Sequence, residues 1–251
     1  MKAHIAESAK IGANTDLGIN AIVMEKVEIG ANCLIGNNVI IYEGSVIGDN
    51  VRIDDNTIIG KKPLSSPRSI FKVDNDLQPA VIGDQCQIGA FVTIYVQAEI
   101  GANNLIADLA TIRENVKIGE LNIIGRNVAI ENFCQIGDRN KFETNCYITA
   151  YSVIEDYCFV APAVATSNDN YMARDPERYQ HFKGITMKTG SRIGVNSTIL
   201  PGKIIGKDGT VAAGALVTKD VKQAEIVAGS PARKFRAVPE KQLLKNNLDK
   251  K

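Results

Sequence analysis

Residues 27–53 read VEIGANCLIGNNVIIYEGSVIGDNVRI, and this stretch decides the fold. Every sixth position holds an aliphatic residue, at Ile29, Ile35, Ile41, Ile47 and Ile53. Two positions before each of these lies a small or β-branched residue: Val27, Cys33, Val39, Ser45 and Val51. Side chains two positions apart share a face of a strand, so each hexad predicts one short strand with two inward side chains. The remaining positions form a turn in which Gly or Asn can adopt a positive φ.

The same frame extends over most of the 251 residues. It runs for ten hexads from Ile5 to Ile59, for fourteen from Ile82 to Val160, and for five from Ile193 to Val217. Three hexads would close one 18-residue coil. A β-sandwich would need turn signals every 8–12 residues and would not keep this register, so we predict one continuous β-solenoid domain.

Composition narrows the function classes. Lys plus Arg number 29 against 28 Asp plus Glu, a formal charge of +1, which indicates neither nucleic-acid binding nor a polybasic membrane patch. No apolar run reaches the length of a membrane span, and the opening MKAHIAESAK lacks the apolar region of a signal peptide. We therefore expect a cytoplasmic protein that contacts neither membrane nor nucleic acid.

The repeat pattern [LIV]-G-x-x-[STAV]-x and residues 205–236, IGKDGTVAAGALVTKDVKQAEIVAGSPARKFR, resemble the hexapeptide-repeat acyltransferases. The resemblance implies an all-β, left-handed parallel β-helix, a homotrimer with active sites between subunits, and acyl-CoA as cosubstrate. The handedness comes from the resemblance, because crossover connections are normally right-handed. We predict a β-helix domain over residues 1–220, with insertions at about 61–79 and 166–190, and a tail with a short helix over 221–251.

The cysteines and histidines limit the chemistry. All five cysteines occupy the small inward position of a hexad, which predicts core packing: Cys33, Cys86, Cys134, Cys146 and Cys158. The two histidines, His4 and His181, are too few for the three-imidazole zinc site of hexapeptide-repeat carbonic anhydrases, so no metal is expected. Neither lies in the regular coils of the middle or C-terminal thirds. The base is then a carboxylate, or the substrate amine needs none.

Residues 18 apart should stack on successive coils about 4.8 Å apart. One column then holds Tyr95, Arg113 and Glu131, and Glu143 lies on another face. At the next turn position, Asp108 falls below Arg126 and Glu114 falls below Asn132. A solvated ion pair of little energetic value is the plain alternative for Arg113 with Glu131.

Two segments favour the functional interpretation of these columns. IADLATIREN (106–115) and IIGRNVAIENFCQIG (123–137) resemble the segment of nucleotide-sugar and related acyltransferases in which acidic and Arg residues face the substrate. The resemblance implies that Asp108 or Glu131 holds or deprotonates an amine. Arg113, Glu114, Tyr95 and Glu143 complete the candidate substrate contacts. Alternatively, the departing sulfur of coenzyme A takes the proton.

The two insertions offer further candidates. The first, KKPLSSPRSIFKVDNDLQP, carries Lys61, Lys62, Arg68 and Lys72, which suit either a solvated bulge or contact with a diphosphate. The second opens with TSNDNYMAR, which resembles the T-N-D-x-[YF] motif of amino-sugar acyltransferases, whose loop covers a neighbouring subunit's cleft. A simple turn would also explain the motif. The resemblance implies three substrate contacts: Asn168, Asp169 and Tyr171.

Coenzyme A binding is expected near the C-terminal coils. Small residues there permit the close approach of a thin ligand, and in the family a groove between two prisms takes the pantetheine arm. The segment GSPARKFR (229–236) resembles the part near the adenine and phosphates; a basic tail leading to a surface helix is the alternative. The candidates are Ala161, Ala213, Gly214, Lys219, Arg233 and Lys234.

The resemblance therefore implies an N-acyltransferase that moves an acetyl or short hydroxyacyl group from acyl-CoA to a nucleotide-diphosphate-linked amino sugar, with a dTDP-linked amino-dideoxyhexose as first candidate. Acyltransferases of tetrahydrodipicolinate, serine or lipid A precursors are alternatives in the same class. A non-catalytic solenoid scaffold is the alternative from another class.

Overall fold

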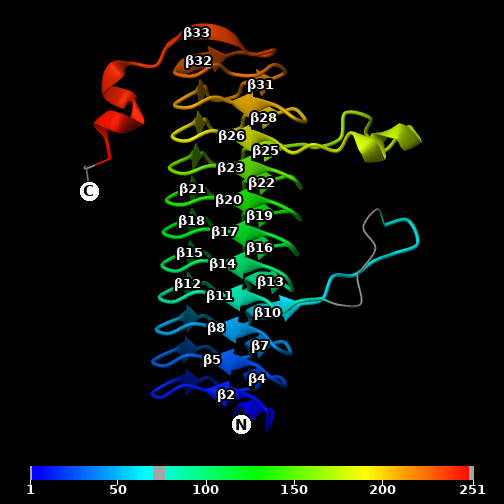
Figure 1. The fold of residues 1–251 in the computed structure, drawn as a ribbon, viewed down its shortest axis with the longest axis vertical. Helices are drawn as coiled ribbons and strands as arrows, with labels where there is room; N and C mark the ends of the chain where they lie inside the picture. The colour runs from blue at the N-terminus through cyan, green and yellow to red at the C-terminus, as the bar shows by residue number, and fades with distance from the viewer. Residues whose placement is uncertain (1, 70–76, 249–251) are drawn as a thin grey trace.

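The computed structural model describes residues 2–69 and 77–248. Lys72 of the first insertion and the last three residues of the predicted tail helix lie outside the described residues. Within them, the strands form three stacked sheets of 11, 10 and 12 strands, which are the faces of a long prism (Figure 1). We call these faces sheets A, B and C.

Sheet A contains, in spatial order, β1 (His4–Ile5), β4 (Ile22–Val23), β7 (Ile40–Ile41), β10 (Ile58–Lys61), β13 (Thr93–Tyr95), β16 (Thr111–Ile112), β19 (Ala129–Ile130), β22 (Tyr147–Ile148), β25 (Ala165–Thr166), β28 (Thr198–Ile199) and β31 (Leu216–Val217). Sheet B contains β2 (Lys10–Ile11), β5 (Glu28–Ile29), β8 (Val46–Ile47), β11 (Val81–Ile82), β14 (Glu99–Ile100), β17 (Lys117–Ile118), β20 (Gln135–Ile136), β23 (Val153–Ile154), β26 (Thr186–Met187) and β29 (Ile204–Ile205). Sheet C contains β3 (Asp16–Leu17), β6 (Leu34–Ile35), β9 (Arg52–Ile53), β12 (Gln87–Ile88), β15 (Leu105–Ile106), β18 (Ile123–Ile124), β21 (Lys141–Phe142), β24 (Phe159–Val160), β27 (Arg192–Ile193), β30 (Thr210–Val211), β32 (Glu225–Ala228) and β33 (Arg233–Ala237).

The hexad explains both the strands and the core. In most two-residue strands the second residue is aliphatic and points inward. It pairs in parallel with its counterpart on the next coil, usually 18 positions on, as Ile112 does with Ile130. The turns between strands hold many residues at positive φ, of which Asn is the most frequent, as at Asn32 with φ 56°. The five predicted core cysteines are all buried free thiols. Phe142 is the largest fully buried side chain.

Both insertions leave the prism at the same edge. β10 continues into the first insertion and β25 into the second, and both strands belong to sheet A, immediately before the chain turns toward sheet B. Figure 1 shows the two loops projecting to the same side of the prism. We call the row of turns from sheet A to sheet B the A–B edge. Four rungs of this edge, after β13, β16, β19 and β22, lie between the loops.

The second insertion is shorter than the sequence predicted. Thr166 ends β25 and Met187 ends β26, and both side chains are buried at inward positions. The hexad frame missed these two strands because it was traced through aliphatic residues. The excursion proper contains one 3-10 helix, η1 (Pro176–Gln180).

The C-terminal region also differs from the prediction. The coil continues past residue 220, because Val221 bridges to Ile205 and β32 pairs in parallel with β30. β33 then folds back antiparallel on β32. Instead of one helix, two short 3-10 helices follow, η2 (Glu240–Gln242) and η3 (Leu244–Asn246). The extended backbone of Leu243, with ψ 145°, separates them. In the described part of the chain no helix is long and apolar enough to cross a membrane.

Candidate active site

The column predicted on sheet A is present at the A–B edge. The guanidinium carbon of Arg113 lies 4.8 Å from the ring centroid of Tyr95, one rung away. On the other side, Nη1 of Arg113 lies 3.8 Å from Oε2 of Glu131. The parallel register of β13, β16 and β19 places these three side chains in line. The column occupies the first three of the four rungs between the two insertions.

Glu114 is the closest partner of Arg113. Its carboxylate accepts hydrogen bonds from Nε of Arg113 at 2.8 Å and from Nη2 at 3.0 Å. Nδ2 of Asn132, one rung further along, donates a short hydrogen bond to the same carboxylate. Glu114 is only 6% exposed. It therefore faces the interior of the corner, where its two hydrogen bonds orient Arg113.

The electrostatics of the edge distinguish Glu131 from its neighbours. Burial raises the pKa of the Glu131 carboxyl; the charge of Arg113 opposes this shift and that of Glu114 adds to it. Burial and the charge of Glu131 likewise raise the pKa of Tyr147. The Glu131 side chain keeps 24% of its surface exposed. A carboxylate that is half-buried, reachable and raised in pKa can accept a proton from a bound substrate.

Asp108 does not join this group. It follows β15 at the turn from sheet C to sheet A, which we call the C–A edge, and its Oδ1 accepts the backbone N–H of Ala90 at 2.9 Å. The same bond recurs at other turns, where Asp49 accepts from Ala31 and Asp138 from Glu120. The sequence presents Asp108 and Glu131 as alternatives for one site. The structure separates them onto different edges and gives Asp108 a repeated turn-stabilising contact.

Glu143 is also on the C–A edge, after β21, where it pairs with Nζ of Lys141 at 2.9 Å. Sheet A separates it from Arg113.

The three candidates in the second insertion organise that loop. Asp169 accepts the backbone N–H groups of Tyr171 at 2.8 Å and Ala173 at 3.1 Å, and pairs with Nη1 of Arg178 at 2.8 Å. The Tyr171 ring stacks on His181 with centroids 5.8 Å apart. The backbone oxygen of Asn168 accepts the Lys183 N–H at 3.1 Å, which closes the base of the loop. The motif therefore builds a defined projection beside the A–B edge.

The coenzyme candidates fall into three places. Ala161, Ala213 and Gly214 lie on the C–A edge; nothing lies within 4 Å of the space that a Cβ on Gly214 would occupy. Lys219 follows β31 on the A–B edge. Arg233 and Lys234 are exposed on β33, where Lys234 lies 4.0 Å from Glu225. Within one chain, sheet A separates the small-residue group from the Arg113 column.

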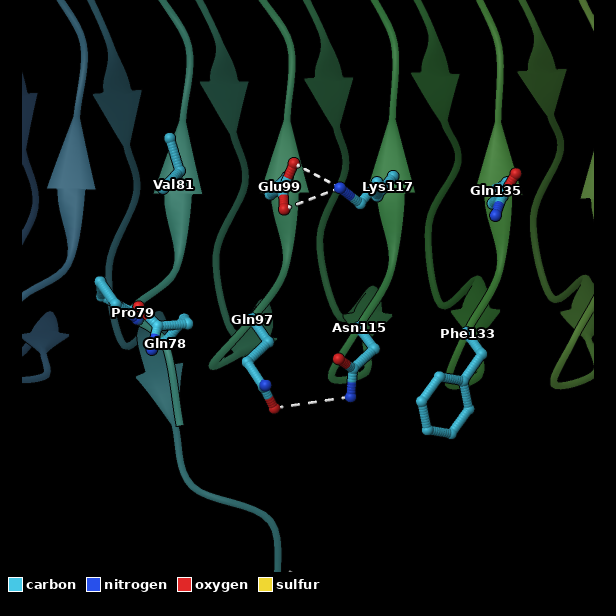
Figure 2. Close-up of a pocket in the computed structure, with 9 residues that line it drawn as sticks. All are labelled: Gln78, Pro79, Val81, Gln97, Glu99, Asn115, Lys117, Phe133 and Gln135. Atoms are coloured by element: carbon cyan, nitrogen blue, oxygen red, sulfur yellow. Dashed lines mark hydrogen bonds and ion pairs between the residues drawn. The ribbon is translucent and has the colours of Figure 1, made fainter. Parts of the chain in front are cut away.

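A groove beside the A–B edge was not anticipated from the sequence. It has a volume of about 640 Å³ and lies over sheet B, beginning where the first insertion returns at Gln78 and Pro79 (Figure 2). Nζ of Lys117 pairs with Glu99 at 3.0 Å across its floor, and Asn115 donates to Gln97 at 3.5 Å along its rim. The outward column at 18-residue spacing along sheet B is the signal that could have located it: Val81, Glu99, Lys117 and Gln135.

Across residues 2–69 and 77–248, no group of three His, Cys, Asp or Glu side chains could hold a metal ion.

Family models identify the repeats. The model described as "Bacterial transferase hexapeptide (six repeats)" matches residues 2–43, and the "Hexapeptide repeat of succinyl-transferase" matches residues 26–61 and 189–219. No curated protein matches the sequence.

Solved structures identify the fold. A UDP-N-acetylglucosamine acyltransferase aligns with a TM-score of 0.62 at 17% identity, over 98% of this chain and 78% of that one. The corresponding enzyme from Bacteroides fragilis aligns at 0.55 and 20% identity, over 94% and 72% of the two chains. That from Campylobacter jejuni aligns at 0.53 and 17%, over 93% and 72%. Repeats and fold agree: the chain carries hexapeptide repeats in the matched residues and has the left-handed parallel β-helix fold of these structures.

Proposed function

We propose that this protein is an N-acyltransferase that moves an acetyl or short hydroxyacyl group from acyl-CoA to the amino group of a nucleotide-diphosphate-linked sugar. The observation that carries the proposal is Glu131, a half-buried carboxylate of raised pKa on an edge flanked by both insertions. The structures that share the fold are described as acyltransferases of a nucleotide-linked sugar, which favours the same substrate class here.

In the proposed reaction, the amine nitrogen attacks the thioester carbonyl carbon. The C–N bond forms, the C–S bond breaks, and the electron pair of that bond leaves with the sulfur. The nitrogen loses one proton, which Glu131 accepts and then returns to the thiolate, so the products are amide and thiol. Arg113, oriented by Glu114, holds the substrate near Glu131. In the substrate-assisted alternative the thiolate takes the proton directly.

We also propose that acyl-CoA binds along the C–A edge, past Ala161, Ala213 and Gly214, with Arg233 and Lys234 toward its phosphates. Lys219 lies on the A–B edge, so the neighbouring subunit would contribute it. Because sheet A separates the C–A edge from Glu131 within one chain, a site that uses both needs two chains. A homotrimer that brings the C–A edge of one subunit against the A–B edge of the next meets this requirement. Sedimentation equilibrium tests it: a mass of one chain would contradict the shared site.

Acyl transfer to a hydroxyl group is the second candidate. The nitrogen of UDP-N-acetylglucosamine, which the matched structures name, already carries an acyl group, so hydroxyl groups are the acceptors that remain on that sugar. A hydroxyl is a weaker nucleophile than a neutral amine and depends more on a general base. His4 lies on the first strand and His181 lies in the second insertion, so Glu131 would have to act as the general base.

The test is a thiol-release assay with acetyl-CoA and a panel of dTDP- and UDP-linked sugars, some carrying an amine and some only hydroxyls. We expect turnover of amino sugars, and in Glu131→Gln a fall in kcat of about 100-fold or more. The matched control is Glu28→Gln, which removes an exposed carboxylate paired with Lys10 several rungs away. Turnover of hydroxyl acceptors alone would support the second candidate, and no turnover of any sugar would refute both.

A further inference from the structure

A backbone irregularity brings Lys61 into the Tyr95–Arg113–Glu131 column. In a regular coil the residue after the inward aliphatic residue stands in the outward column, and after Ile59 that residue is Gly60. The β10–β13 register shifts between Ile59 and Lys61, so that Lys61 rather than Gly60 pairs with Tyr95. Gly60 has φ 77°, a conformation that glycine adopts without steric cost.

Lys61 is held against Tyr95 from the side opposite Arg113. Its Nζ lies 4.8 Å from the ring centroid and 3.5 Å from the phenolic oxygen. The backbone oxygen of Lys61 accepts the Val96 N–H at 3.1 Å. The cation–π contact orients the ammonium without neutralising its charge. The column therefore reads cation, aromatic ring, cation and carboxylate along four successive rungs.

The two cations of the column differ in availability. Arg113 donates from Nε and Nη2 to Glu114 and approaches Glu131 through Nη1, so its charge is largely satisfied within the protein. No carboxylate among the described residues lies within 4 Å of Lys61. The Lys61 side chain is partly exposed. An ammonium in this state retains its capacity to bind an anion from solution.

We propose that Lys61 binds the diphosphate of the nucleotide-linked substrate and, with Tyr95, sets its position relative to Glu131. The inference rests on the proposed function and identifies the residue that binds the negative charge of the substrate. Lys61 and Glu131 are three rungs apart, roughly 14 Å along the prism at the usual strand spacing.

The decisive variant is Lys61→Met, which removes the charge and keeps an unbranched side chain. We expect the KM for the nucleotide-linked amino sugar to rise about tenfold or more, because a charge-assisted hydrogen bond is lost. The loss should appear mainly in KM rather than in kcat, because Lys61 binds the diphosphate and does not touch the reacting atoms. The KM for the corresponding free amino sugar should not change, and Lys61→Arg should restore most of the affinity.

Lys62→Met is the matched control. Lys62 is the next residue and is exposed, so it reports the general effect of removing one positive charge from this loop. The KM of Lys62→Met for the nucleotide-linked amino sugar should stay within about twofold of the wild-type value, because an exposed charge contributes only long-range attraction. Equal KM values in Lys61→Met and Lys62→Met would overturn the inference while leaving the acyltransferase proposal intact.

Titration with dTDP and UDP separates failure of this inference from failure of the proposed function. If wild-type protein turned over no sugar on the panel, the proposed function would be refuted, and the anion site would be judged on binding alone. Weaker diphosphate binding in Lys61→Met than in Lys62→Met supports the site. Equal binding in the two variants, or no binding by wild-type protein, overturns it.

Discussion

The guanidinium of Arg113 is bound more closely by its own neighbour Glu114 than by Glu131 on the next rung. Two hydrogen bonds of 2.8 and 3.0 Å join it to Glu114, whereas 3.8 Å separates it from Glu131. Arg113 therefore lowers the pKa of Glu131 only enough to oppose the effect of burial. Because Arg113 lies between two carboxylates, the pKa of Glu131 depends on both Arg113 and Glu114.

We predict opposite shifts in the pH profile for changes at Arg113 and Glu114. A base must be deprotonated to act, so kcat/KM should fall as the pH drops through the raised pKa of Glu131. Arg113→Met removes the charge that lowers this pKa and should move the acidic limb to higher pH. Glu114→Gln removes a charge that raises it and should move the limb to lower pH.

The measurement is kcat/KM from pH 4.5 to 8 for both variants, with Lys10→Met as control. Lys10 is exposed and pairs with Glu28 several rungs from Glu131, so its loss should leave the limb in place. Shifts in the same direction would contradict the assignment of Glu131 as base.

Glu131→Gln should stabilise the fold at neutral pH. The pKa of Glu131 is higher in the folded protein than in the unfolded chain. The stability that the protonated form contributes is therefore fully present below the unfolded-state pKa, and it is lost as the pH rises through the folded-state pKa. Replacing the ionised carboxylate should raise the free energy of unfolding by up to about 1 kcal/mol, about 2–4 °C in Tm. The difference should vanish at pH values below the ordinary range of glutamate, as thermal melts at pH 3.5 and 7.5 would reveal.

The native thiols should resist modification. Burial raises the pKa of Cys134 to about 12, and those of Cys146 and Cys158 to about 11, so almost no thiolate exists at pH 8. A chromogenic disulfide reagent should therefore detect no fast-reacting thiol in native protein and five thiols after denaturation. Rapid reaction of one cysteine, with loss of activity, would point to chemistry that the fold does not predict.

Phe142→Ala should cost about 3–5 kcal/mol in the free energy of unfolding, the usual penalty for a cavity of this size. Phe142 is fully buried, whereas Phe91 keeps 57% of its surface exposed. Phe91→Ala is thus the matched control and should change stability by less than about 1 kcal/mol. Chemical denaturation of both variants provides the comparison.

Gly60→Ala should reproduce the effect of Lys61→Met. A side chain at φ 77° strains the bulge that places Lys61, so we expect a higher KM for the nucleotide-linked sugar and a loss of about 1 kcal/mol or more in stability. Gly44→Ala introduces similar strain at φ 73° on a rung outside the column, and should lower stability alone. An unchanged KM in Gly60→Ala, despite the loss of stability, would separate the bulge from binding.

Much of this protein follows from its sequence. The six-residue period determined the strands, the core and the vertical columns, because inward and outward positions alternate and every coil repeats after 18 residues. It aligned Tyr95, Arg113 and Glu131 and assigned the cysteines to the core. It also left the regular coils of the middle and C-terminal thirds without a histidine.

Only the tertiary structure decided which of the aligned residues contact one another. The period assigns a residue to an edge, but it does not say whether its side chain turns back to a neighbouring backbone, as Asp108 does to Ala90, or into the corner, as Glu114 does. The period cannot predict a bulge either. Lys61 enters the column because the register shifts beside Gly60, which adopts a positive φ. A repeat specifies average geometry, whereas the candidate site is made of local departures from it.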